Sequence, residues 1–308
     1  MKTRPYLLHA LSPLHAGTGQ AVGVIDLPIA RMRSTGIPIV PASSIKGVLR
    51  DARRTDKPAL PDSERENLLA VFGPDTEHAA DHAGALVVGD AHLLALAVRS
   101  FKGTFAWVSS PLLLDLARRD LQGSPGAPTV IPVVGKERAA VSAIGEDSGS
   151  LNVHGKAKDA AIFLEDLDFS VAAVPEVETW ASFLAPFVAP AGHTTLFARR
   201  FVVVDDESMT FLWETATQID TRVRISPETR TVAQGALWTE ESLPPETLLI
   251  GLLAAEDARR PRGGGPGLDA ATVLELALPE ETTLQFGGKA TIGRGRCRMV
   301  PLERKAAT

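Results

Sequence analysis

An extended segment is predicted to turn into a helix within Gly36-Ile-Pro-Ile-Val-Pro-Ala-Ser-Ser-Ile-Lys-Gly-Val-Leu-Arg50. This junction is the clearest structural signal in the sequence. Ser43 and Ser44 are typical helix caps, and they predict a helix over Ile45–Arg54. On that helix the cations Lys46, Arg50, Arg53 and Arg54 share one face, and the apolar residues Ile45, Val48, Leu49 and Ala52 share the other. The serines and the free amides of the first turn lie at the positive end of the helix dipole, which attracts phosphate. The helix is therefore either a phosphate site or an ordinary amphipathic helix with solvated charges.

The sequence on either side of this stretch mixes strands and helices. Residues 4–11 read as a first strand, and a glycine-punctuated loop follows it. We expect further helices over Glu64–Phe72, Ser109–Leu121, Trp180–Val188 and Asp269–Leu278, and strands over Gly84–Asp90, Ile162–Phe169, Thr195–Val204 and Leu248–Ala255. A hairpin over 221–238, a loop over 259–267 and a strand–glycine loop–strand over Leu284–Met299 complete the pattern. Because the elements do not alternate strictly, the pattern predicts an α+β fold rather than a doubly wound sheet.

Composition excludes several classes of protein. The chain has 308 residues, of which 44% are hydrophobic and 22% charged, so it can bury a sizeable core and is not a disordered protein. Its apolar runs are far shorter than the roughly 20 residues of a membrane span, and the N-terminus lacks the pattern of a signal peptide. The single cysteine, Cys297, excludes an intramolecular disulfide and a multi-cysteine zinc site. We therefore expect a cytoplasmic protein with no membrane partner.

Charge is distributed unevenly along the chain. The net charge of −5 argues at first against a nucleic-acid partner, but residues 1–54 carry +6, residues 285–308 carry +5 and residues 55–284 carry −16. Such asymmetry suggests an acidic body that presents a basic surface built from the two chain ends. A chance distribution over a solvated surface is the alternative.

Glycines and cations are concentrated near the C-terminus, in Gly287-Gly-Lys-Ala-Thr-Ile-Gly-Arg-Gly-Arg-Cys-Arg298. Glycines permit positive φ and can turn backbone amides toward one point, which suits an anion, and Lys289 and Arg294 add cations there. The spacing is neither that of a nucleotide-triphosphate loop nor that of a dinucleotide fold. The segment is therefore either an anion-binding loop or a glycine-rich hairpin.

Two residues between the first strand and the first helix are candidates for chemistry. Asp26 lies between apolar residues in Val24-Ile-Asp-Leu-Pro28, where a carboxylate can act in catalysis or merely cap a turn. His15 is either a base or a packed histidine.

The order of these motifs resembles the RAMP superfamily of CRISPR proteins. The resemblance rests on His15-Ala-Gly-Thr-Gly19, Gly23-Val-Ile-Asp-Leu-Pro-Ile-Ala-Arg31, the stretch Gly36–Arg50 and the C-terminal glycine loop. Within the superfamily, the chain is most similar to the repeated backbone subunit of the type III-B (Cmr) effector complex, which Ala233-Gln-Gly-Ala-Leu-Trp-Thr-Glu-Glu-Ser-Leu-Pro-Pro-Glu-Thr247 supports. The resemblance is dense over residues 5–54, 215–250 and 284–298 and thin between them.

This resemblance implies a fold and a set of partners. The fold is an RRM/ferredoxin-like palm with inserted loops and a β-hairpin thumb, in which one palm domain spans 1–308 and the thumb is an insertion at 215–240. The implied partners are a CRISPR guide RNA, a target RNA, further copies of the chain and other subunits of the Cmr complex. Phosphate contacts would hold the guide without reading its sequence, and base pairing would select the target.

The resemblance also implies metal-dependent cleavage of the paired target RNA at regular intervals, with Mg²⁺ or Mn²⁺ as the cofactor. The family's catalytic aspartate falls on Asp26, its loop histidine on His15, and its glutamate on Glu240 or Glu241. The implied RNA-binding residues are Ser43, Ser44, Lys46 and Arg50 of the helix and Gly287, Gly288, Lys289 and Arg294 of the glycine loop. The hairpin would add Arg222 and Arg224 on one face, while Val223 and Ile225 on the other face wedge between base pairs.

Two roles remain open for Asp26 in the implied reaction, in which a splayed nucleotide's 2′-OH attacks the adjacent phosphate. The aspartate either takes the 2′-OH proton or holds the divalent ion. An unperturbed aspartate has a pKa of about 3.9 and is a poor base at pH 7, which favours the metal ligand. The competing class of function is a non-catalytic RNA-binding scaffold of the same complex, and a stand-alone guide-processing endonuclease is a third.

Overall fold

The structure is a computed structural model, and it describes residues 1–19, 25–54, 60–74, 82–145, 149–155, 159–190, 192–258 and 267–303. The side chains of Arg54 and Gln234 lie outside this description, as do residues 259–266 of the loop predicted over 259–267.

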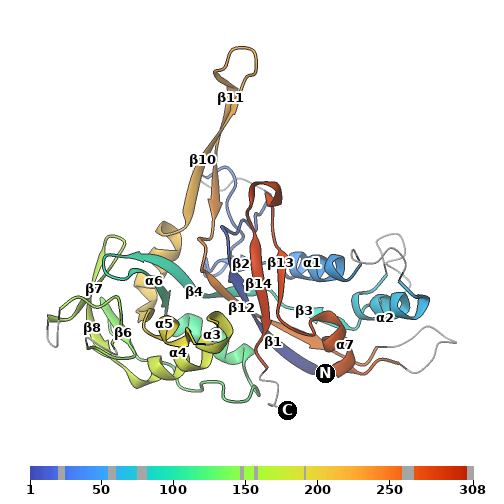
Figure 1. Cartoon of the computed structure of the whole chain (residues 1–308), viewed down its shortest axis with the longest axis horizontal. Coiled ribbons are helices and arrows are strands. Elements are labelled where there is room, and N and C mark those ends of the chain that lie inside the picture. The colour runs from blue at the N-terminus through green and yellow to red at the C-terminus, as the bar shows by residue number, and fades with distance from the viewer. Residues whose placement is uncertain are drawn as a thin grey trace.

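The secondary structure mixes helices and strands along the whole chain (Figure 1). The helices are α1 (Ala42–Arg54), α2 (Asp62–Phe72), α3 (Pro111–Asp120), α4 (Pro175–Val188), α5 (Thr194–Ala198), α6 (Asp206–Thr215), α7 (Ala270–Ala277) and the 3₁₀ turn η3 (Ala290–Ile292). The strands are β1 (Lys2–Ala10), β2 (Ile39–Val40), β3 (Leu86–Val88), β4 (Ala91–Ser100), β5 (Thr104–Ser109), β6 (Arg138–Val141), β7 (Ala161–Leu164), β8 (Leu167–Ala173), β9 (Phe201–Val204), β10 (Gln218–Ile225), β11 (Val232–Ser242), β12 (Leu248–Ala255), β13 (Thr282–Gln285) and β14 (Arg296–Pro301). None of the helices in the described residues is long and apolar enough to cross a bilayer.

Four antiparallel strands in the order β14-β1-β12-β4 form the palm. The chain visits them as β1-α1-β4 and then β12-α7-β14, which is the βαββαβ pattern of the ferredoxin-like fold. This confirms the predicted α+β palm and brings the two ends of the chain side by side, because β1 pairs directly with β14.

Both faces of the palm are covered, which explains why β12 is a continuous apolar run and why the second half of β1, from residue 5 to residue 10, is buried. Tyr6 and Leu8 of β1 pack in one core cluster with Leu49 of α1 and Leu274 of α7. Leu7, between them, points to the opposite face and joins a second cluster that includes residues of α3 and α4. Alternate residues of one strand therefore serve two separate cores.

A second group of strands lies between β4 and β12 in the sequence. The path β4-β5-β9-β6-β8-β7 returns to β4 through the pair Ser100–Leu164, so these strands form a closed ring beside the palm (Figure 1). The two-stranded sheet β10–β11 rises from the body as a long hairpin (Figure 1). It is the predicted thumb. It begins three residues before and ends four residues after the 221–238 hairpin expected from the sequence. The predicted domain limits, 1–308 for the palm and 215–240 for the thumb insertion, stay a prediction.

The structure corrects several of the predicted elements. The strand expected over Ile162–Phe169 is two strands, β7 and β8, because the chain turns at Glu165, which has a positive φ of 49°. The strand expected over Thr195–Val204 is α5 followed by β9, since Phe197 and Phe201 stack on one another within a core. Strands β4 and β5 and helix α6 were not predicted. Helix α1 begins at Ala42, which places both serines inside its first turn rather than ahead of it.

The close approach of Tyr6 to Gly251 gives a test of the palm core. The two residues pair across β1 and β12, and a Cβ atom on Gly251 would lie 2.6 Å from Cζ of the fully buried Tyr6 ring. We predict that Gly251→Ala lowers the free energy of unfolding by about 1–3 kcal/mol, because the ring has no room to shift. Gly47→Ala is the matched control: nothing lies within 4 Å of its Cβ position, so it should stabilise α1 by up to about 1 kcal/mol. Urea denaturation measures both, and a Gly251→Ala protein as stable as the wild type would contradict the packing described.

Candidate functional site

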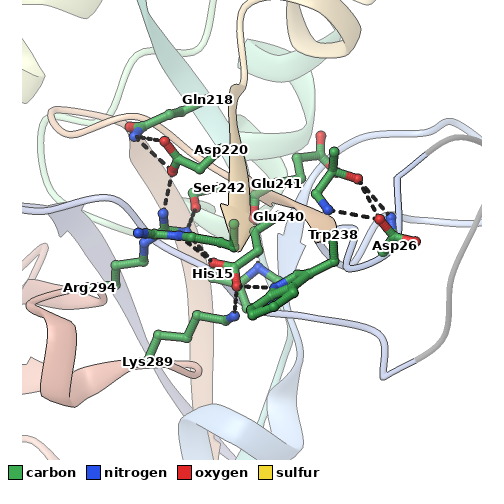
Figure 2. A network of polar contacts seen from close by, with 12 residues as sticks. His15, Asp26, Gln218, Asp220, Trp238, Glu240, Glu241, Ser242, Lys289 and Arg294 are labelled. Carbon is green, nitrogen blue, oxygen red and sulfur yellow. Dashed lines mark hydrogen bonds and ion pairs between the residues drawn. The ribbon is translucent and has the colours of Figure 1, made fainter. Parts of the chain in front are cut away.

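Six side chains share one face of the thumb at its base, and all of them but Arg222 are labelled in Figure 2. The register pairs Gln218 with Ser242, Asp220 with Glu240 and Arg222 with Trp238. Because alternate residues of a strand point to the same face, these side chains lie together, while Thr239 and Glu241 point to the opposite face. The two glutamates that the sequence could not distinguish therefore have different surroundings.

Glu240 is the buried centre of this face. It is 1% exposed, and its Oε1 accepts hydrogen bonds from Nζ of Lys289 and, at 2.7 Å, from the indole N–H of Trp238. Its Oε2 lies 3.4 Å from Nη1 of Arg294 and 3.4 Å from Nε of Arg222. Burial raises the pKa of Glu240, but the hydrogen bonds from Lys289 and Trp238 and the charges of Lys289 and Arg294 together outweigh burial and hold the pKa below its ordinary value. The carboxylate is therefore charged at neutral pH.

Arg294 links Glu240 to the rest of the thumb base. Its side chain is 5% exposed, its Nη1 donates to Oγ of Ser242 at 2.7 Å, and its Nη2 pairs with Asp220 (Figure 2). The sequence predicted RNA contacts for Lys289 and Arg294. In the structure both cations are committed to carboxylates of the thumb, so a phosphate would reach Arg294 only if buried ion pairs opened.

Glu241 fastens the loop after β1 to the thumb. Its Oε1 accepts from Nη2 of Arg31 at 2.6 Å and from the hydroxyl of Thr217 at 3.0 Å, and its Oε2 accepts from the backbone N–H of Ile29 at 3.0 Å. The side chain is 3% exposed. All of these partners are protein groups, which gives Glu241 the geometry of a structural anchor.

Asp26 lies at the edge of the thumb. Its Oδ2 accepts two hydrogen bonds from Thr239, one from the backbone N–H at 2.8 Å and one from the hydroxyl at 2.9 Å (Figure 2). The next residue, Leu27, pairs with Glu240 in a short parallel bridge that holds the segment in place. The backbone N–H of Thr239, followed by its hydroxyl, keeps the pKa of the exposed Asp26 carboxyl below its ordinary value. Asp26 is thus an ionised carboxylate in a fixed position, and within the described residues its Oδ1 has no partner.

His15 lies behind the thumb and is 7% exposed. Its Nδ1 is 2.6 Å from the backbone carbonyl of Glu241, and because a carbonyl only accepts, Nδ1 carries a proton. In the neutral ring, Nε2 is therefore the unprotonated nitrogen. It faces Gly17, where a Cβ atom would be only 2.7 Å away.

The glycine loop packs on the backbone of His15. Gly287 has a φ of 71°, and a Cβ atom there would overlap the carbonyl oxygen of His15, so only glycine fits. The N–H of Gly288 donates to the same oxygen at 3.0 Å, whereas a Cβ on Gly288 would make only ordinary contact. Lys289 adopts a φ of 69°, uncommon for a residue with a side chain, and in that conformation its ammonium reaches Glu240.

Helix α1 offers free charge and free amides. Asp90 accepts from the N–H of Ala42, and no acceptor in the described part of the chain reaches the N–H groups of Ser43 and Ser44. Lys46 donates to the carbonyl of Leu86 at 3.4 Å and Arg50 to that of Pro74 at 2.9 Å. These acceptors are uncharged, so they orient both cations without neutralising them. Burial, with Arg50 adding to it, lowers the pKa of Lys46.

The thumb exposes apolar side chains, one near its base and four in its outer part. These are Ile219, Val223, Ile225, Val232 and Leu237, all between 46% and 63% exposed. Val223 pairs with Leu237 and Ile225 with Val232, with a bulge at Arg224 between the two pairs. Arg224 itself is exposed, whereas Arg222 is drawn toward Glu240.

The described residues contain no group of three or more His, Cys, Asp or Glu side chains arranged to hold a metal ion. Among the described carboxylates bound to the thumb strands, Asp26 offers an exposed, charged oxygen, Oδ1, that none of the contacts above uses. Mg²⁺ keeps several of its waters and binds through one or two carboxylates together with substrate phosphates. The donor set therefore fits a divalent ion shared between Asp26 and a bound phosphate, and does not fit a cage made by the protein alone.

Sequence reasoning missed Thr239, Asp220 and Arg31, which position the predicted residues. The sequence does carry one signal of the shared face: Trp238, Glu240 and Ser242 occupy every second position, as expected for side chains on one face of a strand. The pairing of β10 with β11 was needed to bring Asp220 and Arg294 to the same face.

Comparisons with known proteins agree with this architecture. The RAMP superfamily matches residues 7–298. Over 294 residues the chain is 33% identical to the "CRISPR system Cmr endoribonuclease Cmr4" of Pyrococcus furiosus. The matched region covers 94% of this chain and 92% of the relative. The crystal structure of oligomeric Cmr4 from the same organism superposes with a TM-score of 0.69 and 25% identity over 99% of this chain and all of that one. A chain of the type III-B Cmr-beta complex bound to cognate target RNA has the same fold, with a TM-score of 0.73 and 20% identity over 98% of both chains.

The hydrogen bonds from Thr239 give a test of how Asp26 is held. We predict that Thr239→Val, which removes the hydroxyl and keeps the backbone N–H, raises the pKa of Asp26 toward its ordinary value without reaching it, because the backbone hydrogen bond has the larger effect. The mutant carboxyl would then become protonated at a higher pH than the wild-type carboxyl as the pH falls. An NMR titration of the Asp26 carboxyl carbon measures the shift, with Thr239→Ser as the control that keeps the hydroxyl. Equal pKa values in Thr239→Val and the wild type would rule out the hydroxyl contact.

Proposed function

The chain belongs to the RAMP superfamily, and on that premise we propose that it is a repeated backbone subunit of a type III-B CRISPR ribonucleoprotein, which holds the guide RNA and cleaves the paired target RNA at regular intervals. The observation that carries the proposal is the similarity to the Pyrococcus furiosus endoribonuclease along nearly the whole of both chains. Further copies of this chain and other Cmr subunits are its partners in the proposal.

Helix α1 is the proposed site for the guide backbone. The amides of Ser43 and Ser44 point out of the positive end of the helix, and Lys46 and Arg50 keep their charge because their partners are neutral carbonyls. Contacts of this kind hold phosphates without reading bases. A guide of any sequence can therefore occupy the site, while base pairing selects the target.

The thumb is the proposed wedge. Five large apolar side chains exposed on one hairpin are costly in water unless they contact another surface. Inserted between base pairs, they would unstack a target nucleotide and move its 2′-OH toward the adjacent phosphate. Arg224, exposed at the bulge between the two apolar pairs, would hold the phosphate of the displaced nucleotide.

Asp26 acts in this proposal as an anionic ligand rather than as a base. Its pKa lies below the ordinary value, so at neutral pH it is even less able to take a proton than an unperturbed aspartate. With phosphate oxygens of the target it would hold a divalent ion, Mg²⁺ or Mn²⁺, which supplies positive charge to the developing phosphorane. Attack by the 2′-OH breaks the bond to the 5′-oxygen of the next nucleotide and leaves a 2′,3′-cyclic phosphate.

His15 is the candidate proton acceptor. Because its Nδ1–H donates to the carbonyl of Glu241, the lone pair of Nε2 is available in the neutral ring. Of the two glutamates, Glu240 is the one whose charge faces the site, while Glu241 anchors the loop that carries Asp26. We therefore assign Glu240 an electrostatic role and Glu241 a positioning role.

A non-catalytic scaffold is the second candidate function. The observation that favours it is that Thr239 satisfies Asp26 Oδ2 as a turn cap would. In that reading, guide and target still bind, and cleavage occurs elsewhere in the complex.

The charge on α1 predicts the salt dependence of guide binding. Replacing Lys46 and Arg50 together with alanine should weaken binding and reduce the slope of log affinity against log salt by about 1.4–1.8, because two phosphate contacts no longer release counterions. The measurement is guide-RNA binding across a range of salt concentrations. Arg99→Ala with Lys136→Ala is the control, since it removes two exposed cations away from α1 and should leave the slope unchanged. An unaltered slope in the α1 double mutant would contradict its assignment as the guide site.

A substitution of Asp26 distinguishes the catalytic subunit from the non-catalytic scaffold. Asp26→Asn keeps the size of the side chain and removes the charge that a metal ion needs, so we predict that target cleavage falls by orders of magnitude at saturating Mg²⁺ or Mn²⁺. Guide and target binding should persist, because pairing and the α1 contacts are untouched. The assay is periodic fragmentation of a labelled target by complexes rebuilt with either subunit, and Asp168→Asn, an exposed carboxylate of β8, is the control. Full cleavage with Asp26→Asn would leave the scaffold as the better description.

A further inference from the structure

Trp238 differs from the other three tryptophans of the chain. Trp107, Trp180 and Trp213 are buried in the core clusters, at 6%, 0% and 1% exposure. Trp238 lies on the thumb and is only half-buried. Within the part of the chain that the structure describes, none of the ring–ring or cation–ring contacts involves it. The ring is therefore not used to build the core.

The orientation of this ring is nevertheless fixed. Its N–H donates to Oε1 of Glu240 at 2.7 Å, and that oxygen also accepts from Lys289 (Figure 2). Because the polar edge of the indole is held by a buried carboxylate, the ring cannot rotate without leaving Glu240 with one donor fewer. The hydrogen bond holds the indole by its polar edge, so the ring is kept in one orientation, as a stacking surface requires.

Trp238 also precedes the residue that holds Asp26. The following residue, Thr239, holds Asp26 through its backbone N–H and its hydroxyl. Arg222 is the direct cross-strand partner of Trp238, and its side chain is 39% exposed. A flat apolar surface and a cation thus share one face of the hairpin, and Thr239 holds an ionised carboxylate at the edge of the same strand. This combination suits the base, the phosphate and the reacting end of a single nucleotide.

We propose that the indole of Trp238 is a stacking platform for the base of the target nucleotide that flanks the cleaved phosphate, an inference that rests on the proposed function. Stacking there would hold the unstacked nucleotide in one orientation after the thumb has displaced it. Such a platform accepts any base, because every base has a π face. It would therefore leave the choice of target entirely to the guide.

The test combines a protein change with a change in the RNA. Trp238→Ala is compared with the wild type in the assembled complex, on an intact target and on a target with an abasic residue at the flanking position. Loss of one base–aromatic stack should slow cleavage of the intact target by roughly 5- to 150-fold. On the abasic target the two proteins should cleave at nearly the same rate, because the stack is already absent. An equal loss on both targets would overturn the proposal and make Trp238 a structural residue.

Two further variants separate stacking from the hydrogen bond to Glu240. Trp238→Phe keeps a ring and loses the N–H, so it should retain most of the activity; a Phe variant as slow as the Ala variant would count against stacking. Phe101→Ala is the matched control, since it removes a ring that is 80% exposed and whose ring contacts in the described residues are with Phe163 and His154, away from the thumb. It should cleave both targets at the wild-type rate.

A binding readout distinguishes failure of this inference from failure of the proposed function. A target carrying 2-aminopurine at the flanking position should lose fluorescence when it binds the wild-type complex and keep it with Trp238→Ala, whether or not this chain performs the cleavage. Quenching without cleavage would support the platform and favour the scaffold. Target that binds both complexes with the same fluorescence would overturn the platform alone. Target that fails to bind the wild-type complex would overturn both proposals.

Discussion

The buried charge of Glu240 is the constraint on which the site depends. A carboxylate with almost no exposure is strongly destabilising unless cations and hydrogen-bond donors compensate it. Its compensating groups come from two distant parts of the chain, because Arg222 belongs to the thumb and Lys289 and Arg294 belong to the C-terminal glycine loop. The thumb and the glycine loop can therefore not separate without leaving a charged side chain unpaired, either buried or exposed to water. This requirement also explains why Lys289 tolerates a positive φ, since that conformation brings its ammonium to the carboxylate.

The neighbouring Glu241 applies the same principle on the opposite face of the strand. Its carboxylate captures Arg31 and the N–H of Ile29, and in doing so ties the loop after β1 to the thumb. Two consecutive residues of β11 thus join both ends of the chain to one hairpin. Asp26 is 213 residues away from Thr239 in the sequence. The two residues meet because Glu241 holds the loop that carries Asp26. The position of the candidate catalytic group is a consequence of strand alternation.

The sequence was informative where a pattern is local. Helix α1, the thumb hairpin and β12 follow from capping, turn residues and apolar runs, and the structure places them within a few residues of the predicted limits. The 91–109 segment was missed because both of its strands are buried on two faces and show no alternation. The choice between Glu240 and Glu241 could not be made either, since it depends on which face of β11 meets the glycine loop. The RNA contacts of Lys289 and Arg294 stay a prediction, and the carboxylates that pair with these cations could not be read from the sequence.

The ion pairs at the thumb base do not give this site a net negative charge that would repel RNA. Within the described residues, the network at the thumb base sets the three cations Arg222, Lys289 and Arg294 against the two carboxylates Asp220 and Glu240. One positive charge is therefore in excess, and it lies next to the negative charge of Asp26, so the two nearly cancel at the distance of an approaching phosphate. A chain whose middle segment is strongly acidic can in this way accept a polyanion at its centre. In the proposed function, the attraction that brings the RNA comes from α1, where Lys46 and Arg50 have neutral partners in the described part of the chain, and the thumb base provides geometry rather than affinity.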